Sequence, residues 1–232
     1  NDELSALQKQ YPQKFMSFAS LPMPHVNSSI EEIDRALLDL KMNGLVIGTS
    51  ILGNFLDQKD LDPVFRRADE LNACIFLHPQ PNLGLDHLHE YNLLPICGFI
   101  FDTTCCVARL IFSGFFEKFP NIKVIVPHLV GAIPYLMGRL DIGHEAYPEA
   151  RAIISKPPSE YVKRMYMDLV SYSPEAIRFV AGLLGTDHLL YASDYPFVIG
   201  RPDKIMASMD AAGFSEAEQR QINYENAMRI LN

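Results

Sequence analysis

Three side chains suited to acid–base or metal chemistry end apolar runs in this sequence. His78 falls in ACIFLHP (73–79), His128 ends IKVIVPH (122–128) and Asp194 ends LLYASD (189–194). In folds with parallel strands, functional sites form where the carboxyl ends of the strands meet. Two imidazoles and a carboxylate at one such edge suit a divalent ion such as Zn²⁺ or Mn²⁺, and they also suit proton transfer.

Each of these residues has an ordinary structural alternative. A single His at a strand end is more often packed and hydrogen-bonded than bound to a metal. A carboxylate such as that of Asp194 is rarely buried unless something compensates its charge. Because three such residues end three separate runs, a shared functional site is favoured over three independent structural roles.

The other histidines are weaker candidates. His87-x-His89 has the spacing of a chelating pair on a strand, but its flanking residues predict a loop or short helix, where side chains two apart diverge. The sequence around the remaining three is polar and predicts surface positions; they are His25, His144 and His188.

Arg139 lies in GAIPYLMGRLD, a segment with helical spacing that follows His128. It lies off the apolar face formed by Ile133, Leu136, Met137 and Leu140. One alternative is a solvated Arg paired with a nearby acid. The other is an Arg that binds a carboxylate, for which the guanidinium fork is well suited.

The composition is that of a globular protein. The 232 residues are 48% hydrophobic and carry a formal net charge of −8, which argues against binding nucleic acid or an anionic membrane. We find no apolar run of the roughly 18 residues that a membrane helix needs. Four cysteines without a C-x-x-C pattern predict buried or half-buried free thiols in a reducing, cytoplasmic environment; they are Cys74, Cys97, Cys105 and Cys106.

Six apolar runs alternate with helical segments, which predicts a parallel sheet covered on both faces. The other three runs are FMSFASL (15–21), GLVIGTS (44–50) and RMYMDLV (164–170). Helix starts are predicted by a capping box at Ser29 and Glu32, by Thr104, by Ser173 and by a second box at Ser215 and Glu218. No glycine-rich nucleotide-binding motif follows any run. Six units suit an open sheet, and a (β/α)8 barrel would need two more, for which we expect a segment ahead of Asn1.

Taken together, the segments IFLHP, FPNIKVIVPHLVGAIPYLMGRLD and LLYASDYPF resemble the amidohydrolase-related decarboxylase and hydrolase family. This family contains aminocarboxymuconate-semialdehyde decarboxylase and γ-resorcylate decarboxylase. The opening NDELSALQKQYPQKFMSFASLPM is similar to the family's segment after its second strand, so the resemblance covers essentially the whole chain.

The resemblance implies a single domain over 1–232, a (β/α)8 barrel that lacks its first two strands, with one divalent metal at its mouth. Zn²⁺ is the first expectation, and Mn²⁺ or Mg²⁺ would also suit. His78 and Asp194 match metal ligands, His128 matches an acid–base residue, and Asp194 can also move a proton. Arg139 matches an Arg that crosses a dimer interface to bind the substrate carboxylate, which implies a homodimer and a small carboxylate substrate.

Two departures from the family pattern bear on function. The family's H-x-H metal ligands belong to its first strand, which this sequence does not contain. Leu129 and Val130 stand where the family usually has two glycines. The first expectation is a metal-dependent decarboxylase of a small aromatic or unsaturated acid. The alternatives are a metal-dependent hydrolase of a lactone or amide, and a barrel without catalysis.

Overall fold

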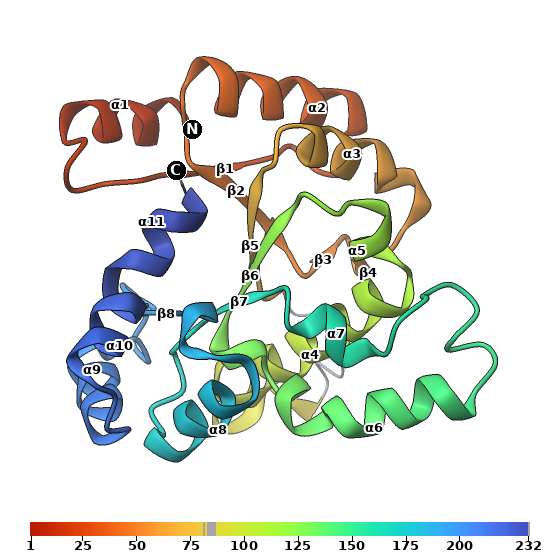
Figure 1. Cartoon of the computed structure of the whole chain (residues 1–232). Helices are drawn as coiled ribbons and strands as arrows, with labels where there is room; N and C mark the ends of the chain where they lie inside the picture. The colour runs from red at the N-terminus through yellow and green to blue at the C-terminus, as the bar shows by residue number, and fades with distance from the viewer. Residues whose placement is uncertain (81, 83–86, 232) are drawn as a thin grey trace.

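The computed structural model describes residues 1–80, 82 and 87–231. Its main sheet has six parallel strands in the order β1-β2-β5-β6-β7-β8 (Figure 1). The strands are β1 (Phe18–Ser20), β2 (Gly44–Gly48), β5 (Cys74–His78), β6 (Lys123–Val126), β7 (Tyr166–Asp168) and β8 (Leu189–Leu190). Each lies within one of the six predicted runs, so the predicted parallel sheet is confirmed. A small antiparallel hairpin, β3 (Ser50–Ile51) and β4 (Asn54–Phe55), was not predicted.

Helices connect successive strands and pack around the sheet (Figure 1). The α-helices are α1 (Asp2–Gln10), α2 (Val26–Asp34), α3 (Asp62–Glu70), α4 (Phe99–Phe112), α5 (Phe115–Lys118), α6 (Ile133–Ala146), α7 (Pro158–Val162), α8 (Pro174–Leu184), α9 (Pro202–Ala211), α10 (Glu216–Arg220) and α11 (Asn226–Leu231). Shorter 3-10 and π turns are η1 (Arg35–Asp39), η2 (Lys59–Leu61), η4 (Glu90–Asn92), η5 (Leu94–Gly98), η6 (His128–Val130), η7 (Thr186–His188) and η8 (Gln221–Glu225).

Two of the four predicted helix starts are confirmed. Ser173 caps α8, where its hydroxyl accepts a hydrogen bond from the Ala176 backbone N–H at 3.2 Å. Ser215 and Glu218 form a complete capping box at α10. Each cap satisfies backbone N–H groups that the first turn of a helix leaves without a partner.

The other two predicted helix starts are wrong. Helix α2 begins at Val26, so Ser29 lies inside it, buried with its hydroxyl on the Met23 sulfur. Thr104 lies inside α4, which begins at Phe99 because η5 continues into it. The Thr104 hydroxyl donates to the Ile100 carbonyl at 2.7 Å and accepts from the Ala132 N–H at 2.9 Å, which ties α4 to the turn before α6.

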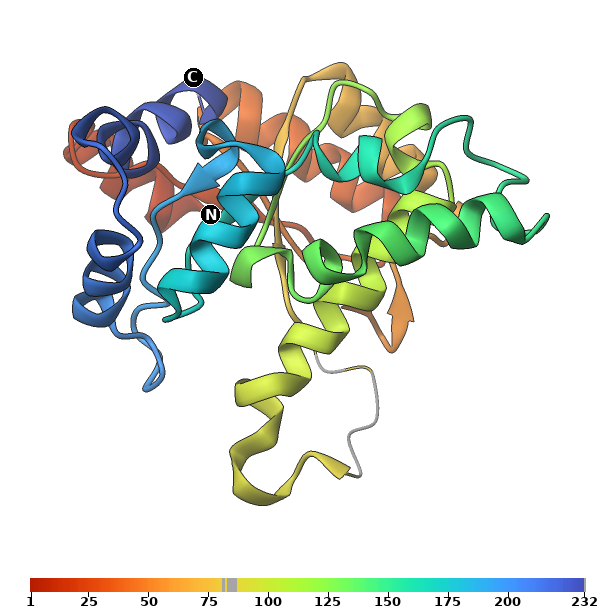
Figure 2. The ribbon, with the colours of Figure 1, turned by 60° about the horizontal axis from the view of Figure 1, so that its bottom comes forward.

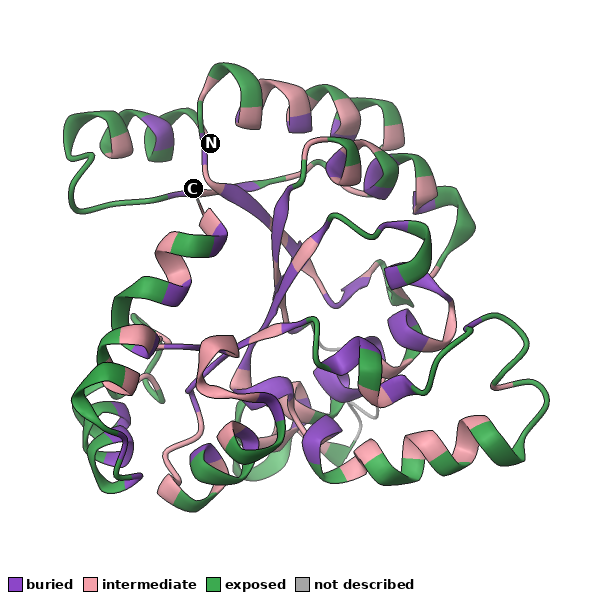
Figure 3. Cartoon of the chain, in the orientation of Figure 1, coloured by how far each residue is buried: buried purple, intermediate pink, exposed green. Residues whose placement is uncertain are grey.

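Successive side chains of the strands enter two separate apolar clusters. Ile75 and Leu77 belong to the large core between the sheet and the surrounding helices. Cys74 and Phe76 belong to a smaller cluster on the other face of the sheet, against which Ile230 of α11 packs. The strands are buried along most of their length, and exposed residues concentrate on the outer faces of the helices (Figure 3).

Within the described residues, β1 and β8 each pair with a single neighbour. The parallel order, with a helix-containing connection between consecutive strands of the sheet, is that of consecutive βα units of a barrel. The predicted α/β architecture is therefore confirmed, and a closed eight-stranded barrel stays a prediction.

The helical stretch Glu90–Phe112 is long and apolar enough to cross a membrane by length and composition. Our expectation that no run meets this test is therefore wrong. The match is weak evidence for a membrane helix, because 44% of its most apolar window is buried inside the fold and core helices pass the same test. The N-terminal part of this stretch projects from the body of the molecule (Figure 2), and Tyr91, Ile96 and Phe101 are exposed there.

Candidate active site

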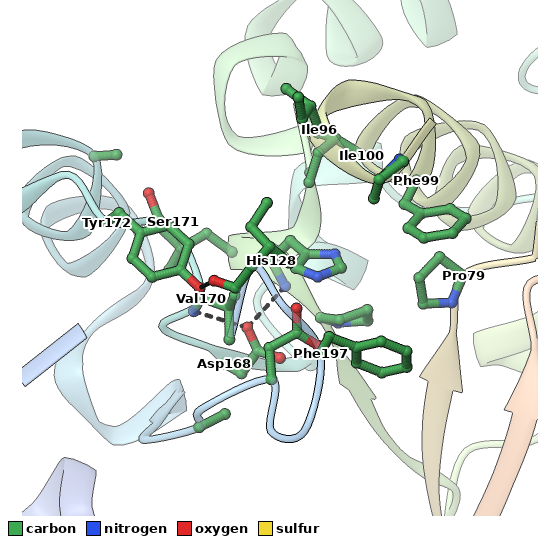
Figure 4. A pocket seen from close by; sticks show the side chains of 18 of the residues that line it. Pro79, Ile96, Phe99, Ile100, His128, Asp168, Val170, Ser171, Tyr172 and Phe197 are labelled. Carbon is green, nitrogen blue, oxygen red and sulfur yellow. Dashed lines mark hydrogen bonds between the residues drawn. The ribbon is translucent and has the colours of Figure 1, made fainter. Parts of the chain in front are cut away.

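A cavity of about 990 Å³ opens where the strands end, a size typical of small-molecule sites. His78, His128 and Asp194 all line it, so the structure brings together the three residues predicted from separate runs. A fourth polar residue, Asp168, was not predicted as a site residue. Figure 4 shows the Asp168 carboxylate directed at the backbone nitrogen of His128, with Phe99, Phe197 and Pro79 at one side.

His78 is the last residue of β5, where it stands beside Gly48 of β2. Its ring nitrogen Nδ1 lies 3.1 Å from the Pro79 carbonyl oxygen. Because a carbonyl oxygen only accepts hydrogen bonds, Nδ1 carries a proton in this contact, and in the neutral ring Nε2 then has the lone pair. This is the tautomer of a histidine that binds a metal through Nε2.

His128 follows β6 after Pro127 and has a left-handed backbone conformation, with φ of 57°. Its buried Nδ1 has no hydrogen-bond partner among the described residues. Burial, together with a smaller effect of the nearby His78, lowers the pKa of His128 to about 4. The ring is therefore neutral at pH 7, with a nitrogen free to accept or pass on a proton.

Asp168 ends β7 and is buried. One carboxylate oxygen accepts hydrogen bonds from the backbone N–H groups of His128, at 2.7 Å, and Val170, at 3.0 Å (Figure 4). The pKa of Asp168 is raised to about 7, because burial and, to a smaller extent, the charge of Asp194 outweigh the lowering effect of the two N–H groups. Asp168 therefore holds the backbone of His128 in place. The signal in the sequence was a carboxylate within the apolar run RMYMDLV.

Asp194 lies four residues beyond the end of β8, in a turn with φ of 56°, and is half-buried. Burial raises its pKa, whereas the proximity of His78 lowers it. The Asp194 carboxyl group is therefore close enough to His78 for the imidazole to affect its pKa. Asp194, which its position after a strand and its charge single out in the sequence, thus lines the cavity.

Arg139 does not line this cavity. It is exposed on α6 and lines a separate outer groove together with Leu136, Leu140 and Tyr147. Among the described residues that line the main cavity there is no Arg or Lys, and the charged side chains there are Asp168 and Asp194. The structure therefore does not bring Arg139 together with His78, His128 and Asp194.

The remaining predictions for histidines and cysteines have mixed outcomes. His25 is exposed, as expected, and His87 and His89 are exposed as well. His188 is half-buried, because Nδ1 contacts the Met165 carbonyl oxygen at 2.8 Å and its ring stacks on Tyr166. His144 is also half-buried, so the expected surface position is wrong for both.

All four cysteines are free and at least half-buried, as expected. Burial raises the pKa of Cys74 to about 12, which makes that thiol a poor nucleophile.

Aromatic and aliphatic side chains form most of the cavity wall. Phe76, Phe99, Phe179 and Phe197 are among them. Tyr172, which sequence reasoning also missed, holds the loop that carries Phe197: its hydroxyl donates to the Ile199 carbonyl and accepts from the Arg201 N–H. An apolar cavity with a few converging polar groups suits a flat, unsaturated ligand.

Two of the described residues that line the cavity have donor atoms suited to a divalent ion. His78 presents the free Nε2, and Asp194 is a carboxylate in the same cavity, so both donors are of the type that divalent ions prefer. No group of three or more His, Cys, Asp or Glu side chains is clustered closely enough to hold a metal within residues 1–80, 82 and 87–231. His78 and Asp194 are thus the right type of donor for a divalent ion, and they would form only part of its ligand set.

A parallel α/β sheet with His and Asp at the carboxyl ends of its strands defines an enzyme-like site of the barrel class. The whole chain, residues 1–232, matches the family model Amidohydro_2, described as amidohydrolase. The chain belongs to this family, which confirms the resemblance seen in the sequence.

Curated relatives include decarboxylases. The 2-amino-3-carboxymuconate-6-semialdehyde decarboxylase of Dictyostelium discoideum is 32% identical over 234 residues, which cover all of this chain and 65% of that protein. A γ-resorcylate decarboxylase of a Rhizobium strain is 27% identical, with 100% of this chain and 74% of that protein covered. This chain thus spans about two thirds to three quarters of the length of these relatives.

Solved structures with the same fold also include decarboxylases. The 5-carboxyvanillate decarboxylase of Sphingomonas paucimobilis superposes with a TM-score of 0.91 at 26% identity, covering 99% of this chain and 70% of that chain. Its counterpart from Novosphingobium aromaticivorans has a TM-score of 0.91 at 28% identity, covering 99% and 68%, and was solved with manganese and 3-methoxy-4-hydroxy-5-nitrobenzoic acid. Manganese in this relative does not support the expectation of Zn²⁺ over Mn²⁺.

Proposed function

We propose that this protein is a metal-dependent decarboxylase of a small aromatic or unsaturated carboxylic acid. The observation that carries the proposal is the convergence of His78, His128 and Asp194, from three strand ends, on one cavity with apolar walls. The decarboxylases among the relatives support the reaction type, and the aromatic compound in the manganese-containing structure supports the substrate class.

His78, through Nε2, and Asp194 would hold the metal, and residues outside the described set would complete its ligands. The expected barrel with two further strands ahead of Asn1 belongs to this proposal, and the share of its relatives' length that the chain spans supports it. A bound divalent ion would supply the positive charge that a substrate carboxylate and a neighbouring oxygen need. We propose Mn²⁺ before Zn²⁺, because a manganese-containing relative is known; Mg²⁺ is a further candidate.

The protein's own side chains would handle the proton. When the bond between the ring carbon and the carboxylate breaks, CO2 leaves and the electron pair stays on that carbon, which then takes up a proton. Burial lowers the pKa of His128, so its ring is neutral at pH 7 and carries one N–H proton instead of two. We propose that Asp194 delivers this proton, because it lines the cavity, and that His128 orients the substrate; burial raises the pKa of Asp194 against the lowering effect of His78.

Arg139 has a proposed role in a homodimer. It is exposed on α6, away from its own cavity, and that cavity has no cationic side chain among its described lining residues. We propose that Arg139 of each subunit binds the substrate carboxylate in the other subunit's cavity. The four free thiols support a reducing, cytoplasmic location.

Release of CO2 tests the proposal. The purified protein with Mn²⁺ is incubated with a panel of hydroxybenzoates and unsaturated semialdehyde acids, and CO2 is measured. Wild type should release CO2 from at least one of them, and Asp194→Asn should reduce the rate by about 100-fold or more, the scale of a lost proton donor. The control is Asp210→Asn, the same change at an exposed position of α9.

Two outcomes would reject decarboxylation. A ring-opened or hydrolysed product without CO2 would establish the hydrolase alternative at the same site. No turnover of any substrate by protein with stoichiometric metal would favour the barrel without catalysis. Equal rates in Asp194→Asn and Asp210→Asn would remove Asp194 from the mechanism.

A further inference from the structure

Thr49 contacts the backbone on both sides of the proposed ligand His78. It directly follows β2 and its side chain is fully buried. Its backbone N–H donates to the His78 carbonyl oxygen at 2.8 Å. Its hydroxyl oxygen accepts the Gln80 N–H, also at 2.8 Å. One residue thus fixes the chain at position 78 and again at position 80.

Asp102 controls the direction of the Thr49 hydroxyl. It lies in the first turn of α4 and is 1% exposed. One of its carboxylate oxygens accepts the Thr49 hydroxyl proton in a short hydrogen bond. With that proton donated to Asp102, a lone pair of the hydroxyl oxygen faces the Gln80 N–H. Burial raises the pKa of Asp102, whereas the Thr49 hydroxyl and the backbone N–H groups of Gln80 and Asn82 lower it, so the carboxylate faces the same segment of chain.

Pro79 connects this backbone contact to the histidine ring. Its carbonyl oxygen accepts the Nδ1 proton of His78 at 3.1 Å, and it lies between the two backbone positions that Thr49 fixes. The position of that oxygen sets the orientation of the ring and which nitrogen bears the proton. The contacts therefore run from Asp102 to Thr49, to the Pro79 peptide, and finally to Nδ1 of His78.

We propose that Thr49 and Asp102 are positioning residues that hold His78 in the Nδ1-protonated form with Nε2 directed into the cavity. The proposal rests on the proposed role of His78 as a metal ligand. It extends that role to two buried residues that do not line the cavity. Outer partners of this kind typically change metal affinity about 10- to 100-fold when they are removed.

The chemistry requires a hydroxyl at position 49. The side chain must donate to a carboxylate and accept from an N–H at the same time, which a hydroxyl does and a methyl group does not. Thr49→Val keeps the shape and removes both contacts, whereas Thr49→Ser keeps both. The chain offers a matched control: Thr103 is also fully buried, but its hydroxyl has no partner among the described residues.

The first experiment reads the tautomer of His78 by ¹⁵N NMR in metal-free protein, at a pH where the ring is neutral. Wild type, Thr49→Ser and Thr103→Val should show the Nδ1-protonated form. Thr49→Val should show a mixture of the two tautomers. The second experiment measures the Mn²⁺ Kd of the same four proteins by titration. Thr49→Val should bind about 10- to 100-fold more weakly than Thr103→Val.

The two experiments separate failure of this inference from failure of the proposed function. An unchanged tautomer and an unchanged Mn²⁺ Kd in Thr49→Val would overturn the positioning role while leaving the metal site standing. A changed tautomer in a protein that binds no Mn²⁺ even as wild type would support the positioning role and overturn the metal site. If Thr49→Val does not fold, Asp102→Ala takes its place, with the same expected changes and the same control.

Discussion

His128, Leu129 and Val130 adopt left-handed backbone conformations in succession, with φ of 57°, 51° and 62°. Such a conformation costs an L-residue about 1–2 kcal/mol, and a β-branched residue such as Val130 adopts it only rarely. Asp168 helps to impose the turn by accepting the His128 N–H. The preference for glycine after this His in the resembling family therefore has a physical reason in this backbone. In this chain Leu129 also adds a side chain to the cavity wall.

Leu129 allows a direct test of this strain. Leu129→Gly should be more stable than Leu129→Ala by about 1 kcal/mol in urea unfolding, because Ala keeps the unfavourable left-handed Cβ. Leu110, equally buried but inside α4, is the control. There the order should reverse, with Ala more stable than Gly by about 1 kcal/mol. The same order at both positions would show that residue 129 is not left-handed.

At the scale of elements, two glycines near α6 have opposite surroundings. Gly131 precedes the helix with φ of 61°, and a Cβ there would lie 2.5 Å from the Thr104 hydroxyl oxygen and 2.7 Å from the Ile100 carbonyl oxygen. Gly138 lies inside α6, where a Cβ would meet no atom within 4 Å. The first glycine allows the turn after His128 to approach α4, and the second has no such role.

These surroundings predict opposite effects of alanine. Gly131→Ala should destabilise the protein by about 2 kcal/mol or more, because it adds backbone strain and a steric clash. Gly138→Ala should stabilise it by about 0.5–1 kcal/mol, because Ala favours the helix. Urea unfolding of both variants beside wild type measures the two effects. A loss at Gly138 as large as that at Gly131 would contradict the described packing.

Most of the sheet could be predicted from the sequence, because buried parallel strands are apolar on both faces and leave clear runs. The residues at the ends of those runs gave three members of the cavity. Asp168 was missed because it lies inside an apolar run. Its role depends on a hydrogen bond from the backbone N–H of His128, which follows the neighbouring strand. The caps at Ser29 and Thr104 failed because tertiary contacts, with Met23 and Ala132, decide what those hydroxyls bind. The contacts of Thr49 with Asp102 join residues 53 positions apart, which no local pattern shows.

At the scale of the whole molecule, metal binding should appear as thermal stability. Mn²⁺ at 100 times its Kd should stabilise the folded protein by about 2.7 kcal/mol, which is about 5–10 °C in Tm for a chain of this size. His78→Ala should lose most of that gain. His87→Ala, an exposed histidine that does not line the cavity, should keep it. Equal gains in the two variants would exclude His78 as a ligand.

Mixing two inactive variants tests the proposed role of Arg139 across a dimer. Arg139→Ala and Asp194→Asn homodimers should each be nearly inactive. After subunit exchange, one site in each mixed dimer would combine an intact Arg139 with an intact Asp194, so activity should recover to about a quarter of the wild-type value. A mixture that remains inactive after proven subunit exchange would rule out the shared site.

The absence of Arg and Lys from the described lining of the cavity has a kinetic consequence. An ionised carboxylate of Asp168 or Asp194 would repel an anionic substrate until a cation occupies the site, so binding should follow a compulsory order, with the ion first and the substrate second. A carboxylic acid that chelates the ion in solution should then inhibit its own turnover at high concentration. The product, which carries a C–H bond in place of the carboxylate and so one negative charge fewer, should bind weakly and cause little product inhibition.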